Sequence, residues 1–358
     1  MKVLHLDISR EWRGGQQQVL YLTQGLEERG VVSVVATTQG SPLAQRLRKL
    51  DLPVIELPPA ASFAPRLVRA LQQILADRRW NVLHAHTAHA HTLGFLAYRL
   101  PPPRPYHRAA FLVARRVDFV PPRDPFSRLK YTTGEQTIVC VSEAIRAILE
   151  RYGVAASSLR VVRSGVQIPG RSDPSDPMPG DADPALRERE RADLRAELGV
   201  PAGSLLLGNI AQFVEHKGQR HLLDALHRIR AEEPRAHLVL LGSGELERDL
   251  RRQAEGLGLD GSVTFAGFRP DAARYLPAMD LFVLSSVEEG LGTSILDAQA
   301  ARVPVVVTRA GGSPEAVDEG TTGLVVPCGD PVALAGGVLE LLHDPARRAR
   351  MGAAGRRW

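Results

Sequence analysis

The chain has 358 residues and a formal net charge of +5 at pH 7, with 44% hydrophobic and 24% charged residues. This composition is that of a globular protein and excludes a chain that is disordered over its whole length. No run of about 18 apolar residues predicts a transmembrane helix, and a usual size of about 100–200 residues per domain predicts two domains.

The first half of the sequence alternates short apolar runs with amphipathic stretches. The stretches carry apolar residues at helical spacing, as Val19, Leu22 and Leu26 do. In chain order we expect strands at 2–8, 31–37, 52–57, 80–86, 109–115 and 137–142, and helices at 14–30, 41–50, 64–79, 88–99 and 143–153. Strands alternating with helices in this way are typical of a parallel sheet that is covered on both faces.

The alternation stops at residues 169–185, where five prolines and almost no apolar side chains exclude core packing. It then resumes, with strands expected at 204–211, 236–242, 262–267, 279–286, 303–308 and 323–327 and helices at 217–233, 245–257, 294–302 and 331–343. The predicted fold class is α/β with two Rossmann-like, doubly wound domains, 1–168 and 194–358, joined by a polar linker at 169–193. Because such sheets bind ligands at the carboxyl ends of their strands, we expect a ligand cleft between the domains.

The net charge hides an asymmetry between the halves. Residues 1–168 contain 23 Lys and Arg against 12 Asp and Glu, whereas residues 169–358 contain 22 against 28. A basic half attracts phosphates, acidic glycans and anionic lipids, so we expect peripheral contact with an anionic membrane. The alternative is arginine on solvated helix faces. Aromatic residues do not interleave with the basic ones, so we expect no nucleic-acid partner.

The start of the chain and its cysteines bear on the compartment. Charges at Asp7, Arg10 and Glu11 interrupt the first apolar run, which therefore resembles a strand more than a signal peptide. Cys140 and Cys328 lie far apart, fit a reducing cytoplasm and lack metal-ligand spacing. We expect a cytoplasmic protein, either free or at the inner face of the membrane.

Glycine turns follow several predicted strands. Gly14-Gly15 precedes the first helix, where glycine lets backbone N–H groups approach a phosphate; a simple tight turn is the alternative. The turn is not G-x-G-x-x-G, so the dinucleotide fingerprint is absent. Gly244 lies in a similar turn, and the backbone of Phe268 and Arg269 after another strand is placed to meet a flat base.

Lys217 stands at a predicted helix start. A lysine there opposes the helix dipole. A bound anion would offset that cost, because the ammonium and the helix N–H groups can hold the same phosphate. A solvated lysine is the alternative.

Four histidines cluster in "HAHTAHAH". His84 and His86 alternate at a strand end and are expected on one face, and His89 and His91 follow. One hypothesis is a zinc site, although the spacing fits no usual pattern. The other hypotheses are a buried histidine with satisfied hydrogen bonds, or a histidine that donates to a sugar hydroxyl.

Two carboxylates flank a glycine turn in "VEEGLGTSILDAQA". Glu289 follows a strand, Gly290 and Gly292 permit close backbone approach, and Asp297 comes later. A carboxylate suits a sugar diol because its two oxygens accept two O–H donors. Alternatively, Ser294 and Asp297 form a capping box, with Ser294 as the N-cap and Asp297 three residues later.

These motifs together resemble glycosyltransferase family 4, the retaining GT-B transferases. "EEGLGTSILDA" is similar to the E-G-F-G-L-x-x-L-E-A segment of that family. Further similarities cover nearly the whole chain in the family's order: "GGQQQ", "HAH", "RSGV", "HKG", "GSGELE", "AGFRP" and "GGSPEAV". The combination is specific for the family, although no single motif is.

The resemblance implies a nucleotide-sugar donor held mainly by the second domain and an acceptor held mainly by the first. By position, the expected catalytic residues are Lys217 on the donor diphosphate, Glu289 on the transferred sugar and His86 near the reacting carbon. The other implied donor-binding positions are Gly14, Gly15, Gln212, Gly244, Phe268, Arg269, Gly290, Leu291, Gly292, Thr293 and Asp297. The resemblance implies no metal and no cofactor, since cationic side chains and helix dipoles stabilise the leaving diphosphate.

The sequence departs from the family pattern at several places. Gln212 stands where the family has arginine, and Asp297 is one methylene shorter than the usual glutamate. "SGVQ" replaces N-G-V-D, and the chain stops at "MGAAGRRW", where the family continues into a last helix. Either closure of the protein differs or the chain is incomplete.

The leading hypothesis is transfer of a sugar, with retention, to a glycan, lipid-linked or small-molecule acceptor in bacterial cell-envelope or exopolysaccharide biosynthesis. The alternative is a degenerate GT-B protein that binds nucleotide-sugar or glycan without turnover, which the glutamine at position 212 favours. A GT-B epimerase would need acid–base residues that the sequence does not display.

Overall fold

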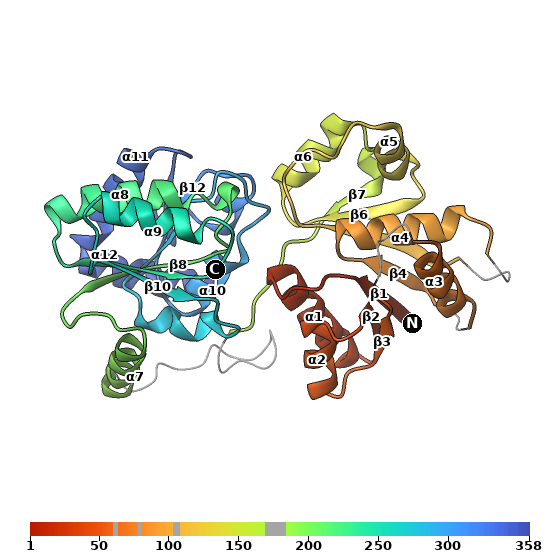
Figure 1. Cartoon of the computed structure of the whole chain (residues 1–358), viewed down its shortest axis with the longest axis horizontal. Coiled ribbons are helices and arrows are strands. Elements are labelled where there is room, and N and C mark those ends of the chain that lie inside the picture. The colour runs from red at the N-terminus through yellow and green to blue at the C-terminus, as the bar shows by residue number, and fades with distance from the viewer. Residues whose placement is uncertain (60–63, 78–79, 103–107, 169–183) are drawn as a thin grey trace. The chain divides into compact units, whose positions relative to one another are not determined.

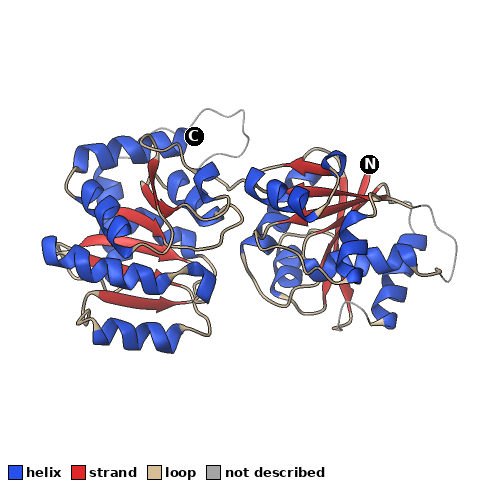
Figure 2. Ribbon diagram, turned by 90° about the horizontal axis from the view of Figure 1, so that it is seen from above, coloured by secondary structure: helices blue, strands red, loops and turns tan. Residues whose placement is uncertain are grey.

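The computed structural model describes residues 1–59, 64–77, 80–102, 108–168 and 184–358. The chain forms two compact units, Met1–Ser164 and Gly165–Trp358 (Figure 1). Each unit is a sheet with helices packed on both of its faces (Figure 2). Among the described residues, no helix is long and apolar enough to cross a membrane.

Unit 1 is built on a seven-stranded parallel sheet of order β3-β2-β1-β4-β5-β6-β7. Its strands are β1 (Lys2–Asp7), β2 (Val32–Thr38), β3 (Val54–Leu57), β4 (Val82–Ala85), β5 (Ala110–Arg115), β6 (Gln136–Cys140) and β7 (Leu159–Val161). Its helices are α1 (Gly14–Glu27), α2 (Pro42–Lys49), α3 (Pro65–Asp77), α4 (Ala88–Arg99), α5 (Pro125–Thr132) and α6 (Glu143–Tyr152), with a 3-10 turn η1 (Ala156–Ser158). The strand order reverses between β1 and β4, and open α/β sheets generally bind ligands at the carboxyl ends of the strands at such a point.

Unit 2 repeats the plan with a six-stranded parallel sheet of order β10-β9-β8-β11-β12-β13. Its strands are β8 (Leu205–Ile210), β9 (Ala236–Leu241), β10 (Val263–Gly267), β11 (Leu281–Leu284), β12 (Val305–Thr308) and β13 (Gly323–Val326). Its helices are α7 (Pro184–Glu197), α8 (Gln219–Glu232), α9 (Glu247–Gly256), α10 (Thr293–Ala300), α11 (Pro331–Leu342) and α12 (Pro345–Arg357). The 3-10 turns are η2 (Glu215–Lys217), η3 (Ala272–Ala278) and η4 (Ser313–Ala316). Here the order reverses between β8 and β11.

The central strands are buried from end to end. Every residue of β9, β11 and β12 is buried, as expected for a parallel sheet between two helical layers. Helix α7 joins this unit through Asp280, whose carboxylate accepts from Arg191 over 2.5 Å and from Arg195 over 2.7 Å. The residues of the predicted linker from 169 to 183 lie outside the described part of the chain, and the rest of that linker is the start of α7.

The α/β class and the doubly wound pattern are confirmed, and each predicted strand and helix forms. Three elements were not expected: α5, β7 and α12. Strand β7 has three residues and α5 has eight, too few to show a period, and α12 reads "PARRARMGAAGRR", where few apolar residues mark a buried face. The helix expected from residue 217 begins at Gln219, because Lys217 lies in the 3-10 turn that precedes it.

Candidate active site

Lys217 and Glu289 form an ion pair at the switch point of the unit 2 sheet. Lys217 Nζ lies 2.7 Å from Glu289 Oε2, and the two side chains are 19% and 12% exposed. The same oxygen accepts from Ser286 Oγ over 3.1 Å, and the Glu289 carbonyl accepts from the Gly312 N–H over 2.9 Å. Two residues predicted separately from sequence therefore occupy one half-buried site.

Backbone contacts tie the two loops of this pair together. The Val287 N–H donates to the His216 carbonyl over 2.9 Å, and Ser285 Oγ donates to the Lys217 carbonyl over 3.1 Å. Gly218 has φ 64°, and a Cβ at this position would lie 2.2 Å from the Ser285 carbonyl oxygen. Only glycine fits here, because both the left-handed conformation and the close approach exclude a side chain.

Three helices at the predicted donor loops begin without a side-chain cap. The N-cap side chain accepts no hydrogen bond from the first turn in α8, α9 or α10, whose N-caps are Gly218, Leu246 and Gly292. At the start of α1, by contrast, Gln16 Oε1 accepts from the Arg13 N–H over 3.2 Å. The N-cap side chains that do accept one belong to α2, α4, α5, α6, α11 and α12: Ser41, Thr87, Asp124, Ser142, Asp330 and Asp344. Uncapped N–H groups and the helix dipole make an anion site.

Asp297 is not a capping residue. The N-cap of α10 is Gly292 at φ 78°, so the predicted capping box of Ser294 and Asp297 is wrong. In the described part of the chain no hydrogen bond or ion pair reaches the Asp297 carboxylate, and burial raises its pKa to about 6. A carboxylate held in this way lacks a protein donor and is suited to accept hydroxyl groups of a ligand.

The other predicted donor residues lie around these loops. Gly290, Leu291 and Gly292 are buried and lead into Thr293, the first residue of α10. The Gln212 carbonyl accepts from Gln219 Nε2 over 2.9 Å, in the loop after β8.

Positions proposed to meet the base lie after β10. Phe268 is 54% exposed, and the Arg269 guanidinium lies 5.8 Å from the centre of the Tyr275 ring. Gly244 packs so closely on the Phe213 backbone that a Cβ would lie 2.3 Å from its carbonyl oxygen.

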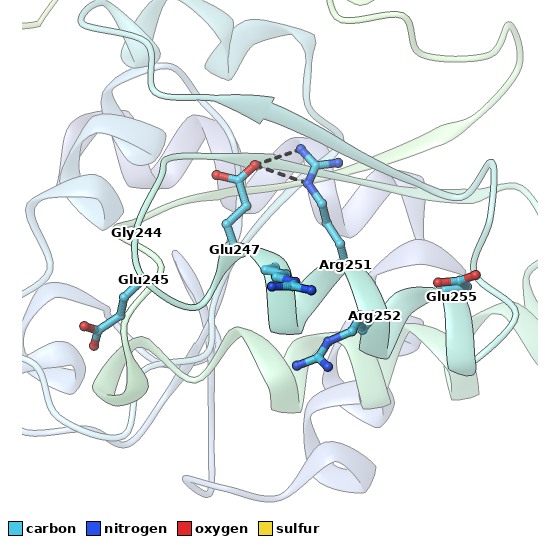
Figure 3. A pocket seen from close by; sticks show the side chains of 7 residues that line it. Gly244, Glu245, Glu247, Arg251, Arg252 and Glu255 are labelled. Carbon is cyan, nitrogen blue, oxygen red and sulfur yellow. Dashed lines mark hydrogen bonds and ion pairs between the residues drawn. The ribbon is translucent and has the colours of Figure 1, made fainter.

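A shallow hollow runs along the length of α9, from the turn before it to Glu255 (Figure 3). It is lined by Gly244, Glu245, Glu247, Arg248, Arg251, Arg252 and Glu255, and Glu247 pairs with Arg251 over 2.8 Å. Only Gly244 of these seven belongs to the predicted donor set. The hollow is therefore a feature of the charged α9 surface, and neither Lys217 nor Glu289 lines it.

In unit 1 the glycine turn lies beside a buried polar cluster. Gly14 and Gly15 are the first residues of α1, and a Cβ on Gly15 would lie 3.8 Å from the Arg116 side chain. Burial lowers the pKa of Arg116 to about 10, against the opposing effect of Asp7. Burial raises the pKa of Asp7, whose Oδ2 accepts from Gln16 Nε2 over 2.9 Å. The buried side chain of Arg116 therefore lies beside the glycine turn of unit 1.

Three histidines cluster in unit 1, but not the predicted four. His84 and His86 do share one face, with ring centres 4.0 Å apart, and are joined by His5 from β1, whose Nδ1 lies 2.9 Å from His86 Nε2. His89 is exposed, and His91 is hydrogen-bonded to the side chain of Gln136. The predicted cluster of four histidines is therefore wrong. The sequence analysis missed His5, which the strand register brings to the cluster: β1 pairs with β4, and His5 stands opposite His84.

The cluster is neutral near pH 7. Burial lowers the pKa of His5 to about 4 and that of His84 to about 3, and it holds the pKa of His86 well below 6.5. The donor nitrogens of the three rings lie within 4.8 Å of one another, a grouping that suits zinc. The bond between His5 and His86 already occupies one nitrogen of each ring.

Acid should weaken unit 1 through these histidines. Their folded pKa values are depressed, so below about pH 6.5 the unfolded chain binds protons that the folded unit does not, and stability falls down to at least about pH 3, the pKa of His84. We expect His84→Gln to make this decline shallower by roughly 1 kcal/mol per pH unit. Urea unfolding in a Trp358→Phe background, where Trp12 and Trp80 of unit 1 supply the fluorescence, measures the slope.

The exposed His89 supplies the control. His89→Gln should leave the pH slope as it is in the parent chain. Equal slopes for the parent and His84→Gln would contradict a neutral buried cluster.

Two family profiles match the chain. "Glycosyltransferase Family 4" matches residues 12–168, and "Glycosyl transferases group 1" matches residues 190–358. Together they span most of both units, including the Lys217–Glu289 pair and, of the histidine cluster, His84 and His86.

Similar proteins agree with these matches. The lipopolysaccharide core biosynthesis glycosyltransferase LpsD of Rhizobium meliloti is 28% identical over 99% of this chain and 92% of its own length. LpsE of the same organism is 37% identical over 45% of this chain, a match that spans about half of LpsE, 46% of its length. The crystal structure of Anabaena HepE in complex with UDP-glucose has a TM-score of 0.82 at 23% identity and covers 100% of this chain and 94% of that one. That likeness bears on the fold, which is GT-B. The chain belongs to the family 4, group 1 glycosyltransferases.

Proposed function

We propose that this chain transfers a sugar from a nucleotide-sugar donor to an acceptor with retention of configuration. The observation that carries the proposal is the Lys217–Glu289 pair, a cation and a carboxylate 2.7 Å apart beside uncapped helix starts. A diphosphate needs positive charge, and a sugar offers hydroxyl donors. Both requirements are met within one pair of loops.

Charge stabilisation is the main contribution of unit 2. As the bond between the sugar carbon and the diphosphate breaks, negative charge grows on the phosphate oxygens. Lys217 and the free N–H groups of α8 and α10 face that charge and need no rearrangement to stabilise it. Glu289 accepts from sugar hydroxyls and holds the ring in place. In this proposal the protein's own charges do the work that a metal ion would do.

Retention follows from departure and attack on the same face of the sugar. The acceptor oxygen forms the new bond to the sugar carbon, and its proton passes to the leaving phosphate oxygen. No protein base is then required. We propose that His86, neutral at pH 7, contacts the sugar as a hydrogen-bonding group, while Asp297 accepts from the ribose.

The acceptor is proposed to be a cell-envelope glycoconjugate. Its support is the naming of LpsD and LpsE, both lipopolysaccharide core glycosyltransferases, and the excess of basic residues in unit 1. We propose that the protein works in the cytoplasm and reaches a lipid-linked or glycan acceptor at the inner face of the membrane. The basic unit supplies the attraction to that surface.

Removing either member of the ion pair should stop transfer. We expect Glu289→Gln and Lys217→Ala to lower kcat by about 100-fold or more, the usual effect of losing a transition-state contact. Product formation from a radiolabelled nucleotide-sugar measures this. Glu288→Gln is the matched control, because Glu288 is the exposed neighbour and should keep near-parent activity. Near-parent activity in both test variants would refute the assignment.

Nucleotide binding should tighten as the pH rises through about 6. The Asp297 pKa is raised to about 6, so the ionised form that accepts two ribose hydroxyls becomes populated only above that pH. Calorimetry with a nucleoside diphosphate between pH 5 and 7.5 measures the effect. Asp297→Asn should bind more weakly and lose the pH dependence around 6; a retained dependence would assign it to another group.

Chelation should leave transfer intact. With Lys217 and the helix starts facing the diphosphate, EDTA is expected to change the rate by less than about twofold. A large loss that zinc restores in the parent chain, and that His5→Gln reproduces, would show that the histidine cluster holds a metal.

One further observation favours a second function, binding without turnover. Gln212 removes one cation from the donor site, so the charge on the diphosphate is less fully matched. A panel of donors screened by thermal shift identifies the bound nucleotide-sugar, since a ligand stabilises in proportion to its affinity. Tight binding with neither hydrolysis nor transfer would favour the second function over the first.

A further inference from the structure

One ring nitrogen of His86 is already bonded, and the other is left for a ligand. Its Nε2 lies 2.9 Å from Nδ1 of His5, which belongs to the neighbouring strand β1. Nδ1 of His86 has no hydrogen-bonding partner among the described residues, although the side chain is only 4% exposed. A buried polar atom without a partner is rare in a folded protein and often marks a catalytic role. Nδ1 is therefore the atom that His86 has left for a sugar.

Strand register and a backbone bond hold the rings of His5 and His86 together. β1 and β4 are parallel neighbours with His5 opposite His84, and the His86 N–H donates to the Leu6 carbonyl over 2.9 Å. His84 and His86 lie on one face, because side chains two positions apart on a strand point the same way. The register brings His5 to that face, with its ring centre 5.1 Å from that of His86. The bond between the rings is thus anchored in the sheet at both ends.

The bond also couples the hydrogens of the two rings. Burial lowers the pKa of His5 to about 4 and holds that of His86 well below 6.5, so both rings are neutral near pH 7. A neutral imidazole carries a single N–H, so one of its nitrogens donates and the other accepts. If His5 donates from Nδ1, then His86 carries its hydrogen on Nδ1. If His86 donates from Nε2 instead, its Nδ1 is a bare acceptor.

Burial favours the first of these two arrangements. His5 is 0% exposed, and its Nε2 has no partner among the described residues. In the second arrangement that nitrogen would carry a hydrogen with no acceptor in reach, and a buried N–H without an acceptor is rarer in proteins than a buried acceptor without a donor. In the first arrangement the deeply buried nitrogen is bare, and the free N–H is on His86, where a sugar oxygen can accept from it.

We propose that His5 is a positioning residue for sugar transfer: it donates from Nδ1 to Nε2 of His86, which holds the His86 ring in place and sets the tautomer whose Nδ1–H donates to an oxygen of the transferred sugar. This rests on the contact between His86 and the sugar in the proposed function, and it names the atom that makes the contact. His5 itself touches no substrate and acts only through His86.

Nitrogen-15 NMR of the full chain, with labelled histidine and no substrate, reads the tautomer directly. The His86 signals are those that vanish in His86→Gln. In the parent chain His86 should carry its hydrogen on Nδ1, and His5→Leu should shift it to Nε2, the tautomer that a histidine side chain prefers in water. A parent chain with His86 protonated at Nε2, or a His5→Leu variant with the parent tautomer, would overturn the proposal. So would bound zinc that His5→Leu loses, because Nδ1 of His5 and Nε2 of His86 would then be ligands.

Two substitutions of equal shape test the consequence for the reaction. Asparagine and leucine have nearly the same shape, but only asparagine has an amide N–H that can donate to Nε2 of His86. In hydrolysis of radiolabelled UDP-glucose or GDP-mannose, His5→Asn should keep kcat within about threefold of the parent, whereas His5→Leu should lower kcat about tenfold or more. KM for the donor should change less than about twofold, because the contact counts most in the transition state. A role in packing alone predicts that leucine is tolerated at least as well as asparagine.

His91→Leu is the matched control for loss of a buried histidine. His91 is 1% exposed and is bonded through Nε2 to Gln136 over 2.8 Å, so His91→Leu should lose stability as His5→Leu does and keep the parent kcat. In a His86→Ala background, His5→Leu should lower the rate no further, and an additional fall would overturn the proposal.

The same variants separate failure of this proposal from failure of the proposed function. Parent-like hydrolysis by His86→Ala would refute the contact between His86 and the sugar. Parent-like hydrolysis by His5→Leu, with His86→Ala inactive, would leave that contact intact and overturn the positioning role of His5.

Discussion

The ion pair between Lys217 and Glu289 joins two loops that are 72 residues apart in sequence. Only the sheet topology brings them together, since β8 and β11 are neighbours where the strand order reverses. Removing either charge would leave the other half-buried and unpaired, at a cost that the pair itself avoids. The pair is therefore both a product of the fold and a constraint on it, and the glycine at position 218 allows the close approach on which it depends.

The helices differ in how their first N–H groups are satisfied. In α2, α4, α5, α6, α11 and α12 a Ser, Thr or Asp side chain accepts from these groups, which stabilises a helix by about 1 kcal/mol. At the proposed donor loops, α8 and α10 begin with glycine and forgo that stabilisation. A bound diphosphate would satisfy the same N–H groups. If the donor binds there, these helices would be more stable with it than without it, and donor binding would be coupled to local order.

Much of the fold and part of the candidate site could be predicted from the sequence, and the predictions that were wrong or missing have physical causes. Apolar runs between glycine turns predicted both sheets, and motif order predicted Lys217 and Glu289. His5 was missed because strand register is not visible in a linear sequence. The capping box failed because Gly292 begins the helix before Ser294 does. Helix α5 was missed because its eight residues are too few to show a helical period.

Charge alone does not locate a membrane surface on unit 1. Its basic residues exceed its acidic ones by 11, yet they are scattered along the sequence, and some, such as Arg115 and Lys130, are buried. Electrostatic attraction reaches about 8 Å at physiological salt and acts on the unit as a whole, so it would draw the unit towards an anionic partner without choosing a face. The excess charge of unit 1 therefore bears on how often such a partner would be met, and not on where it would bind.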